Sequence, residues 1–203
     1  MKQLFLTSSF AEVADKVEDA AGDSLKGRTV AFIATANLPE ESDWYVRDAR
    51  KAFADLGCRI DELEISTADQ DTIRKSLEED ELIYLSGGNT FFLLQELQKT
   101  GAGEQIKDQV NRGKLYIGES AGSVVTGPDI AYLEAMDPRS AAPDLTSTEG
   151  LNLVDFHPLP HYTEEPFAET NYQIIEQYRD SLPIVAITNS QVIRVCDRCL
   201  SIL

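Results

Sequence analysis

Short apolar runs alternate with segments of helical periodicity along most of the chain, and this alternation limits the folds open to it. The strand-like runs cover residues 3–6, 29–34, 59–65, 82–85, 114–117, 153–156, 184–187 and 192–196. The helical segments cover residues 42–56, 71–77, 91–99, 104–111 and 166–178. Strands that alternate with helices form a mostly parallel sheet that is covered on both faces. The pattern therefore predicts a three-layer α/β fold.

The same pattern predicts the extent of the domain, the ends of one helix and the position of a long loop. No linker, repeat or low-complexity tract interrupts the 203 residues, so we expect one domain over residues 1–203. Ser42 is a candidate N-cap for the helix over 42–56, and Gly57 stands where that helix should end. Residues 126–150 have the weakest periodicity and are predicted to form a long loop, a type of segment that is often functional.

Charge and composition exclude several classes of function. The chain carries 35 acidic against 18 basic residues, a net charge of -17, without a basic stripe. Such a surface repels phosphate backbones, so nucleic acid is not an expected partner. No apolar stretch approaches the roughly 20 residues that span a bilayer, and the first residues lack the features of a signal peptide, which predicts a cytoplasmic protein without a membrane partner.

The cysteines are Cys58, Cys196 and Cys199. Cys196 and Cys199 form a C-x-x-C pattern, which occurs in redox pairs and in half of a zinc site. Here the pattern lies between two apolar runs near the end of the chain rather than at the start of a helix. It therefore predicts a hairpin turn with reduced thiols.

A serine lies in the pattern Gly118-Glu119-Ser120-Ala121-Gly122, directly after a strand and before a stretch of small residues. A nucleophile on a sharp strand-to-helix turn has a strained backbone that only small neighbours can surround, and Gly118 and Gly122 leave that space. The alternative interpretation is a glycine-flanked turn with an incidental serine. The position after a strand favours a nucleophile, and a serine nucleophile needs a base.

The chain has only two histidines, His157 and His161, and both follow the predicted strand over 153–156. Ligand sites of α/β proteins gather at the ends of strands, so either histidine could activate Ser120. Pro158 and Pro160 stiffen this segment. Two histidines without a carboxylate at metal-ligand spacing do not predict a zinc site.

A second glycine-rich turn, Ser86-Gly87-Gly88-Asn89-Thr90, also follows a strand and begins a helix. Paired glycines let backbone N–H groups approach a ligand, as in an oxyanion hole. A phosphate cradle is the competing interpretation, but the Walker lysine and the G-x-G-x-x-G spacing are missing. A plain turn into a helix is the third alternative.

Three segments together resemble the signatures of the peptidase E family of serine peptidases, which contains aspartyl dipeptidases and cyanophycinases. They are Leu85-Ser86-Gly87-Gly88-Asn89-Thr90-Phe91, Gly118-Glu119-Ser120-Ala121-Gly122 and Leu159-Pro160-His161-Tyr162. The resemblance covers nearly the whole chain with order and spacing preserved. It implies a parallel sheet flanked by helices, related to the class I glutamine amidotransferases (flavodoxin-like).

The resemblance also implies roles for particular residues. Ser120 would be the nucleophile, His161 rather than His157 the base, and the N–H groups of Gly88 and Ala121 the oxyanion hole. The reaction would be hydrolysis of small peptides through an acyl-enzyme, without a metal or organic cofactor. Asn89, Asn171 and Glu119, which lie in or beside the family's motifs, are candidate substrate-binding residues.

The chain departs from the family at the third catalytic group, which is a glutamate or aspartate in aspartyl dipeptidases. The late glutamate position falls on Asn189, and an earlier acidic position falls near Ala135, with Glu134 and Asp137 as neighbours. Asparagine can orient a histidine but does not stabilise an imidazolium as a carboxylate does. Asn189 and Asp137 are therefore equal candidates for the third group.

The chain also departs from the family in the residues that would recognise the substrate. Aspartyl dipeptidases carry an arginine within Glu-Thr-Arg that pairs with the substrate aspartate, whereas this chain has Glu169-Thr170-Asn171. Without the guanidinium, a buried substrate carboxylate loses its bidentate partner, so weak or no cleavage of Asp-X dipeptides is expected. Two alternatives remain: a serine esterase or amidase, and a binding or regulatory protein on the same fold with little or no activity.

Overall fold

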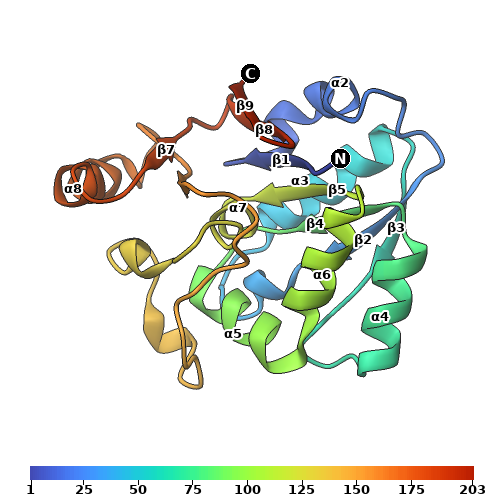
Figure 1. Cartoon of the computed structure of the whole chain (residues 1–203), viewed down its shortest axis with the longest axis horizontal. Helices are drawn as coiled ribbons and strands as arrows, with labels where there is room; N and C mark the ends of the chain where they lie inside the picture. Colours follow the sequence, from blue (N-terminus) through green and yellow to red (C-terminus); the bar gives the residue numbers. More distant parts are fainter.

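The computed structural model describes all 203 residues and contains a seven-stranded sheet with helices on both faces (Figure 1). The strand order is β3-β2-β4-β5-β1-β8-β9. The first five strands of this order run parallel, and β8 is antiparallel to β1 and to β9. The predicted three-layer, mostly parallel, flavodoxin-like α/β fold is therefore confirmed. The strands of this sheet are β1 (Gln3–Thr7), β2 (Thr29–Ile33), β3 (Arg59–Glu62), β4 (Leu82–Leu85), β5 (Leu115–Glu119), β8 (Val192–Cys196) and β9 (Cys199–Ile202).

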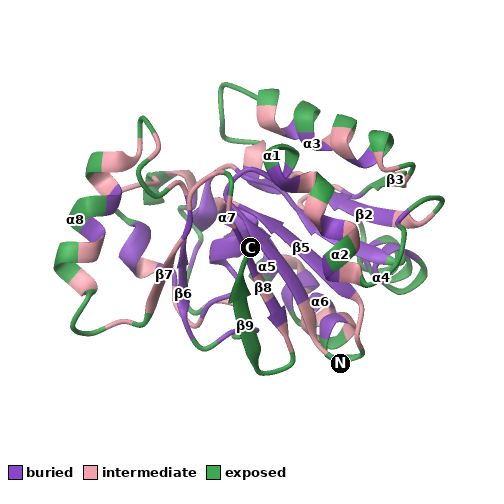
Figure 2. Ribbon diagram, turned by 90° about the horizontal axis from the view of Figure 1, so that it is seen from above, coloured by how far each residue is buried: buried purple, intermediate pink, exposed green.

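The helices divide into two layers because each strand presents alternate side chains to opposite faces of the sheet. One face packs against α1 (Phe10–Val13), α2 (Val17–Ala21) and α3 (Trp44–Asp55). The other face packs against α4 (Gln70–Glu79), α5 (Thr90–Thr100), α6 (Ala102–Asn111) and α7 (Ala121–Val124). In Figure 2 the strands between the two layers are largely buried, whereas β9 is exposed at the sheet edge. None of the helices is long and apolar enough to cross a membrane.

A second, two-stranded parallel sheet stands beside the main one. It contains β6 (His157–Leu159) and β7 (Ile184–Ala186), which are joined through α8 (Ala168–Tyr178). The strand expected over 153–156 is wrong: those residues form no strand, and pairing begins at His157, where the backbone N–H donates to Pro183 O. An apolar run becomes a strand only where a partner strand supplies hydrogen bonds.

Two helix-end predictions have different outcomes. The proposed Ser42 cap is wrong, because α3 begins at Trp44 after Asp43 and no side chain caps its N-terminus. The predicted end at Gly57 is confirmed: this residue follows the helix with φ +77°, a conformation that glycine adopts without strain.

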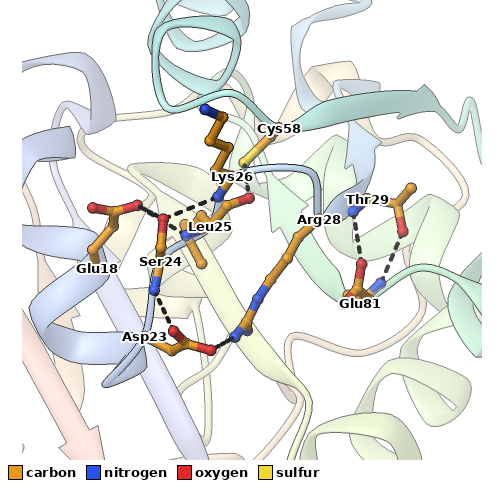
Figure 3. A network of polar contacts seen from close by, with 9 residues as sticks. All are labelled: Glu18, Asp23, Ser24, Leu25, Lys26, Arg28, Thr29, Cys58 and Glu81. Carbon is orange, nitrogen blue, oxygen red and sulfur yellow. Dashed lines mark hydrogen bonds and ion pairs between the residues drawn. The ribbon is translucent and has the colours of Figure 1, made fainter.

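The segment before β2 folds into helices that periodicity did not predict, α1 and α2, joined by a 3-10 turn over Ala14–Lys16. Side chains fix the connection from α2 to β2 (Figure 3). Glu18 accepts hydrogen bonds from Ser24 Oγ and Leu25 N, each at 2.9 Å, and Arg28 pairs with Asp23 at 2.8 Å. The two bonds to Glu18 lower the pKa of its carboxyl group, with the backbone bond as the larger cause.

The C-x-x-C segment is a hairpin turn, as predicted. Cys196 ends β8 and pairs directly with Cys199 at the start of β9, and all three cysteines are free thiols. The long loop over 126–150 is also present, with 3-10 turns at Ala131–Leu133 and Arg139–Ala141 and one bridge between Asp129 and Glu149.

Candidate active site

Ser120 lies in the turn between β5 and α7, at the carboxyl end of a central strand. Its backbone has φ +46° and ψ -107°, a conformation that costs energy for a non-glycine residue. Surrounding contacts hold this turn: the Ser120 N–H donates to Thr7 O at 2.9 Å, and Ser123 Oγ donates to Thr7 O or Gly118 O. The strained serine is therefore fixed by the end of β1.

Only glycine fits at two positions around this turn. A Cβ on Gly122 would lie 2.2 Å from Leu85 O, and one on Gly118 would lie 2.6 Å from Gly122 O. Both distances are far below van der Waals contact, so the pattern of small residues has a steric cause. The small neighbours let the turn pack directly onto the end of β4.

His161 stands beside Ser120, with its Nε2 atom 3.0 Å from Ser120 Oγ. Its Nδ1 atom lies 2.8 Å from Asn189 Oδ1. The amide oxygen accepts the Nδ1 proton, which leaves Nε2 unprotonated and able to accept the proton of the serine hydroxyl. Burial lowers the pKa of His161, so its neutral form is favoured, while the bond to Asn189 acts in the opposite direction.

The backbone of His161 is held as closely as its ring. The residue has φ +59°, its N–H donates to Ser8 Oγ at 2.9 Å, and its carbonyl accepts from Asn171 Nδ2 at 2.8 Å. Phe167 stacks on the imidazole, with ring centroids 4.9 Å apart and planes 26° apart. The histidine is thus restrained on its ring and on both sides of its peptide unit.

The other histidine is not part of this arrangement. His157 begins β6, is buried, and packs edge-on against Tyr132 with ring centroids 5.2 Å apart. Burial lowers its pKa. Of the two histidines that the residues left open, the structure brings only His161 to Ser120.

The Gly87–Gly88 turn lies against the serine turn. A Cβ on Gly87 would lie 3.3 Å from Ser120 Cβ, and Gly88 has φ +129° with the position of its Cβ blocked by Ala36 O at 2.2 Å. The Gly88 N–H donates no hydrogen bond within the chain. Ala121 is the first residue of α7, so its N–H has no acceptor within that helix. Both N–H groups remain free for a ligand oxygen.

The loop over 126–150 braces this glycine turn. Asp137, one of the two candidates for the third catalytic group, accepts the Thr90 N–H at 2.9 Å, and Pro138 O accepts Asn89 Nδ2 at 3.1 Å. Burial raises the pKa of Asp137. Its hydrogen bonds go to the start of α5, and it makes none to His161, whose partner is Asn189.

The three candidate substrate-binding residues are buried. Asn89 and Asn171 are 0% exposed and Glu119 is 2% exposed. Asn89 caps α5 by accepting the Phe92 N–H, and Asn171 donates to Pro160 O and His161 O. Their hydrogen bonds favour a positioning role, and their contact with substrate stays a prediction.

The sequence interpretation missed three residues that shape the site. Ser8 follows β1, so the rule that strand ends form sites could have identified it. Phe167 and the ring of Tyr45, which is 3.5 Å from the Cβ position of Gly87, carry no local signal because packing alone places them. A cavity of about 700 Å³ lies by the β8–β9 hairpin and is not lined by Ser120 or His161.

Comparisons with known proteins identify the family of the chain. The profile of Peptidase family S51 matches residues 4–203. An uncharacterized peptidase of Pasteurella multocida is 49% identical over 195 residues, which are 96% of this chain and 94% of that protein. Peptidase E of Nostoc sp. is 30% identical over 184 residues, which are 87% of this chain and 72% of that protein.

A solved structure shows the same architecture. The crystal structure of a candidate peptidase E from Listeria monocytogenes EGD-e has a TM-score of 0.96 and 44% identity, covering 100% of this chain and 98% of that one. A peptidase from an acI-B1 Actinobacterium has a TM-score of 0.68 at 21% identity, over 96% of this chain and 83% of that one, which supports the fold alone. The chain therefore belongs to peptidase family S51 and is a peptidase.

Proposed function

We propose that the chain is a serine-type peptidase that hydrolyses small peptides through an acyl-enzyme on Ser120. The supporting observation is the continuous set of contacts from Ser120 Oγ to His161 Nε2 at 3.0 Å and from His161 Nδ1 to Asn189 Oδ1 at 2.8 Å. In this proposal residues 1–203 act as one unit.

The proposed chemistry has two steps. Ser120 Oγ attacks the scissile carbonyl carbon while His161 Nε2 takes its proton, and the C–N bond then breaks as His161 returns that proton to the leaving amine. Water, deprotonated by His161, next hydrolyses the acyl ester and restores the Ser120 hydroxyl. The free N–H of Gly88 and that of Ala121 are the proposed donors to the oxyanion, each worth about 3 kcal/mol in the transition state.

Asn189 is the proposed third member. Its amide oxygen holds the tautomer that leaves Nε2 free, but it carries no charge to stabilise the imidazolium that forms. The proposal therefore predicts slower acylation than a carboxylate would give. Asp137 is assigned to the support of the glycine turn, because it accepts the Thr90 N–H.

A fluorophosphonate probe tests this proposal. Labelling of the purified wild-type protein should disappear in Ser120→Ala and weaken strongly in His161→Ala, whereas His157→Asn, a matched control outside the site, should label at the wild-type rate. Turnover of a dipeptide set then tests the substrate class, with weak or no cleavage of Asp-X expected. Rapid hydrolysis of Asp-Leu would contradict the specificity proposal.

A binding or regulatory protein with little activity is the second candidate. It is favoured by the neutral Asn189, which occupies the place of a catalytic carboxylate beside His161. Absence of labelling in folded wild-type protein would support this candidate. Cleavage of activated esters without cleavage of any peptide would instead favour an esterase.

A further inference from the structure

Glu119 is a buried carboxylate directly before Ser120 that the proposed reaction does not use. It ends β5 and is 2% exposed. One carboxylate oxygen accepts the Phe10 N–H at 2.9 Å, and the other accepts the Tyr84 hydroxyl. Both hydrogen bonds favour the ionised form of the carboxylate.

Tyr84, which donates to this carboxylate, belongs to a cluster of aromatic rings. The ring centroid of Tyr84 lies 5.7 Å from that of Phe10, 4.6 Å from that of Phe32 and 5.2 Å from that of Phe53. Burial in this apolar layer raises the pKa of Glu119 to about 7, while its hydrogen bonds act in the opposite direction. Burying a charge costs free energy, and an apolar side chain of similar volume often stabilises such a position as well or better. The glutamate therefore satisfies two buried donors at the cost of a buried charge.

The contacts of Glu119 join two turns of the site. Ser120 follows it in the chain, and Tyr84, whose hydroxyl it accepts, lies on β4, the strand that leads into the Gly87–Gly88 turn. The two turns are already in contact, because the Gly122 N–H donates to Ser86 O at 3.2 Å and a Cβ on Gly87 would lie 3.3 Å from Ser120 Cβ. A small movement of one turn must therefore move the other.

We propose that Glu119 is a positioning residue whose ionised carboxylate holds the Gly87–Gly88 turn at the correct distance from Ser120. This inference rests on the proposed function. When the carboxylate is protonated, one oxygen becomes a donor, its bonds to the Phe10 N–H and the Tyr84 hydroxyl weaken, and the spacing between nucleophile and oxyanion donor relaxes. Ser120 then reacts more slowly, since misplacement by about 1 Å can cost roughly a hundredfold in rate.

The titratable groups around Glu119 come from two other elements. Tyr84 on β4 donates a hydrogen bond to it, and Tyr45 on α3 interacts with it through space. Asp48 on α3 raises the pKa of Glu119. Arg50 on α3 acts on Tyr84 and pairs with Glu62. No cation pairs with Glu119, so backbone and hydroxyl donors stabilise its charge.

The test measures the rate of fluorophosphonate labelling of Ser120 from pH 5 to pH 9. In the wild type, the rate should rise through an inflection near pH 7 from Glu119, separate from the His161 inflection below 6.5. Glu119→Gln cannot accept at both oxygens, so the inflection near pH 7 should disappear and the rate at pH 8 should fall about ten- to a hundredfold. At pH 5 the two proteins should differ little. The fall should be in the maximal labelling rate and not in probe affinity.

Matched variants separate positioning from a general loss of structure. Glu96→Gln removes another carboxylate, 2% exposed, whose partners Gln95 and Lys99 lie outside the site, and it should keep the wild-type profile. If Glu119→Gln does not fold, Tyr84→Phe replaces it: loss of the hydroxyl donor should raise the pKa of Glu119 and move the inflection to higher pH.

Two results would overturn the inference. One is a Glu119→Gln protein that folds and keeps the wild-type rate and pH profile. The other is a Tyr84→Phe protein with an unmoved inflection. Failure of the wild type to label would instead overturn the proposed function, so the two failures are distinguishable.

Discussion

His161 has a backbone conformation that few non-glycine residues adopt, and hydrogen bonds with three side chains restrain it. Asn189 contacts its ring, Ser8 accepts its N–H, and Asn171 donates to its carbonyl. Strained residues persist where surrounding contacts over-determine them. This arrangement separates the residues that would set the basicity of the imidazole from those that set its position.

Asn189 is among the residues that would set the basicity of the imidazole. Replacement by aspartate puts a negative charge next to Nδ1, which favours the imidazolium and raises the pKa of His161. In Asn189→Asp, the acidic limb of the labelling profile should move to higher pH, and acylation above that limb should be faster. Asn189→Ala should lower the rate about tenfold or more without moving Ser120. A folded Asn189→Ala protein with wild-type kinetics would exclude Asn189 from the mechanism.

Asn171 is among the residues that set the position of the imidazole. Asn171→Leu removes both donors and should lower kcat of peptide turnover about tenfold, with KM nearly unchanged, because the histidine loses its anchor but the substrate loses no contact. The reverse pattern, a raised KM with unchanged kcat, would show that Asn171 binds substrate after all. Gln173→Leu, an exposed change on the same helix, is the control and should leave both constants unchanged.

At the scale of elements, the site is assembled from the carboxyl ends of parallel strands. The ends of β4, β5, β6 and β7 supply Gly88, Ser120, His161 and Asn189, and the end of β1 supplies Ser8. β4, β5 and β1 belong to the main sheet, and β6 and β7 belong to the two-stranded sheet. Parallel strands within each sheet place such ends at one edge, and the bond between Ser120 and His161 joins the two sheets. The backbone geometry of these turns must therefore be held as closely as the positions of their side chains.

Replacement of Gly88 by alanine tests whether the backbone of the turn is restricted in this way. A Cβ at this position would lie 2.2 Å from Ala36 O, and the backbone has φ +129°, so Gly88→Ala must displace the turn. We expect a loss of unfolding free energy of roughly 2–4 kcal/mol and a large fall in labelling rate. Gly101→Ala is the control: its φ is +70° but its Cβ position is empty, so it should cost about 1 kcal/mol and leave labelling unchanged. Urea unfolding measures both costs, and equal losses in the two variants would refute the steric argument.

At the scale of the whole molecule, buried carboxyl groups link stability to pH. The pKa of Glu119 in the folded protein is raised to about 7 from its ordinary value of 4.5, so the folded state binds more protons than the unfolded state between these values. Its contribution is therefore fully present below pH 4.5 and is lost as pH rises through 7. Full loss would be about 3 kcal/mol.

Urea unfolding of the wild type and Glu119→Gln at pH 5 and pH 8 measures this contribution. The wild type should lose more stability than the variant on going from pH 5 to pH 8, because glutamine does not titrate. The two histidines cancel from the comparison: burial lowers the pKa of each, and both proteins share the resulting loss of stability below pH 6.5. Parallel stability curves would show that Glu119 is not buried as a titrating group.

Local patterns were sufficient to predict most of the fold. Alternating periodicities predicted a parallel sheet with two helical layers, and the hairpin at Cys196–Cys199 followed from a turn between two apolar runs. Local patterns failed where an element depends on a distant partner. Residues 153–156 are apolar but find no partner strand, so they form no strand, whereas α1 and α2 are short helices held by packing rather than by a long periodic stretch.

The amino-acid sequence by itself determined the turn chemistry: glycines where a Cβ has no space, and a serine after a strand. Only the tertiary structure decided which groups meet, because the bond between Ser120 and His161 joins residues 41 apart and that between His161 and Asn189 joins residues 28 apart. Local propensity acts over a few residues, whereas hydrogen-bond partners at a strand edge depend on the order in which strands enter the sheet. For the same reason, the residues alone left both histidines as candidates for the base, and burial of Asn171 and Glu119 could not be predicted.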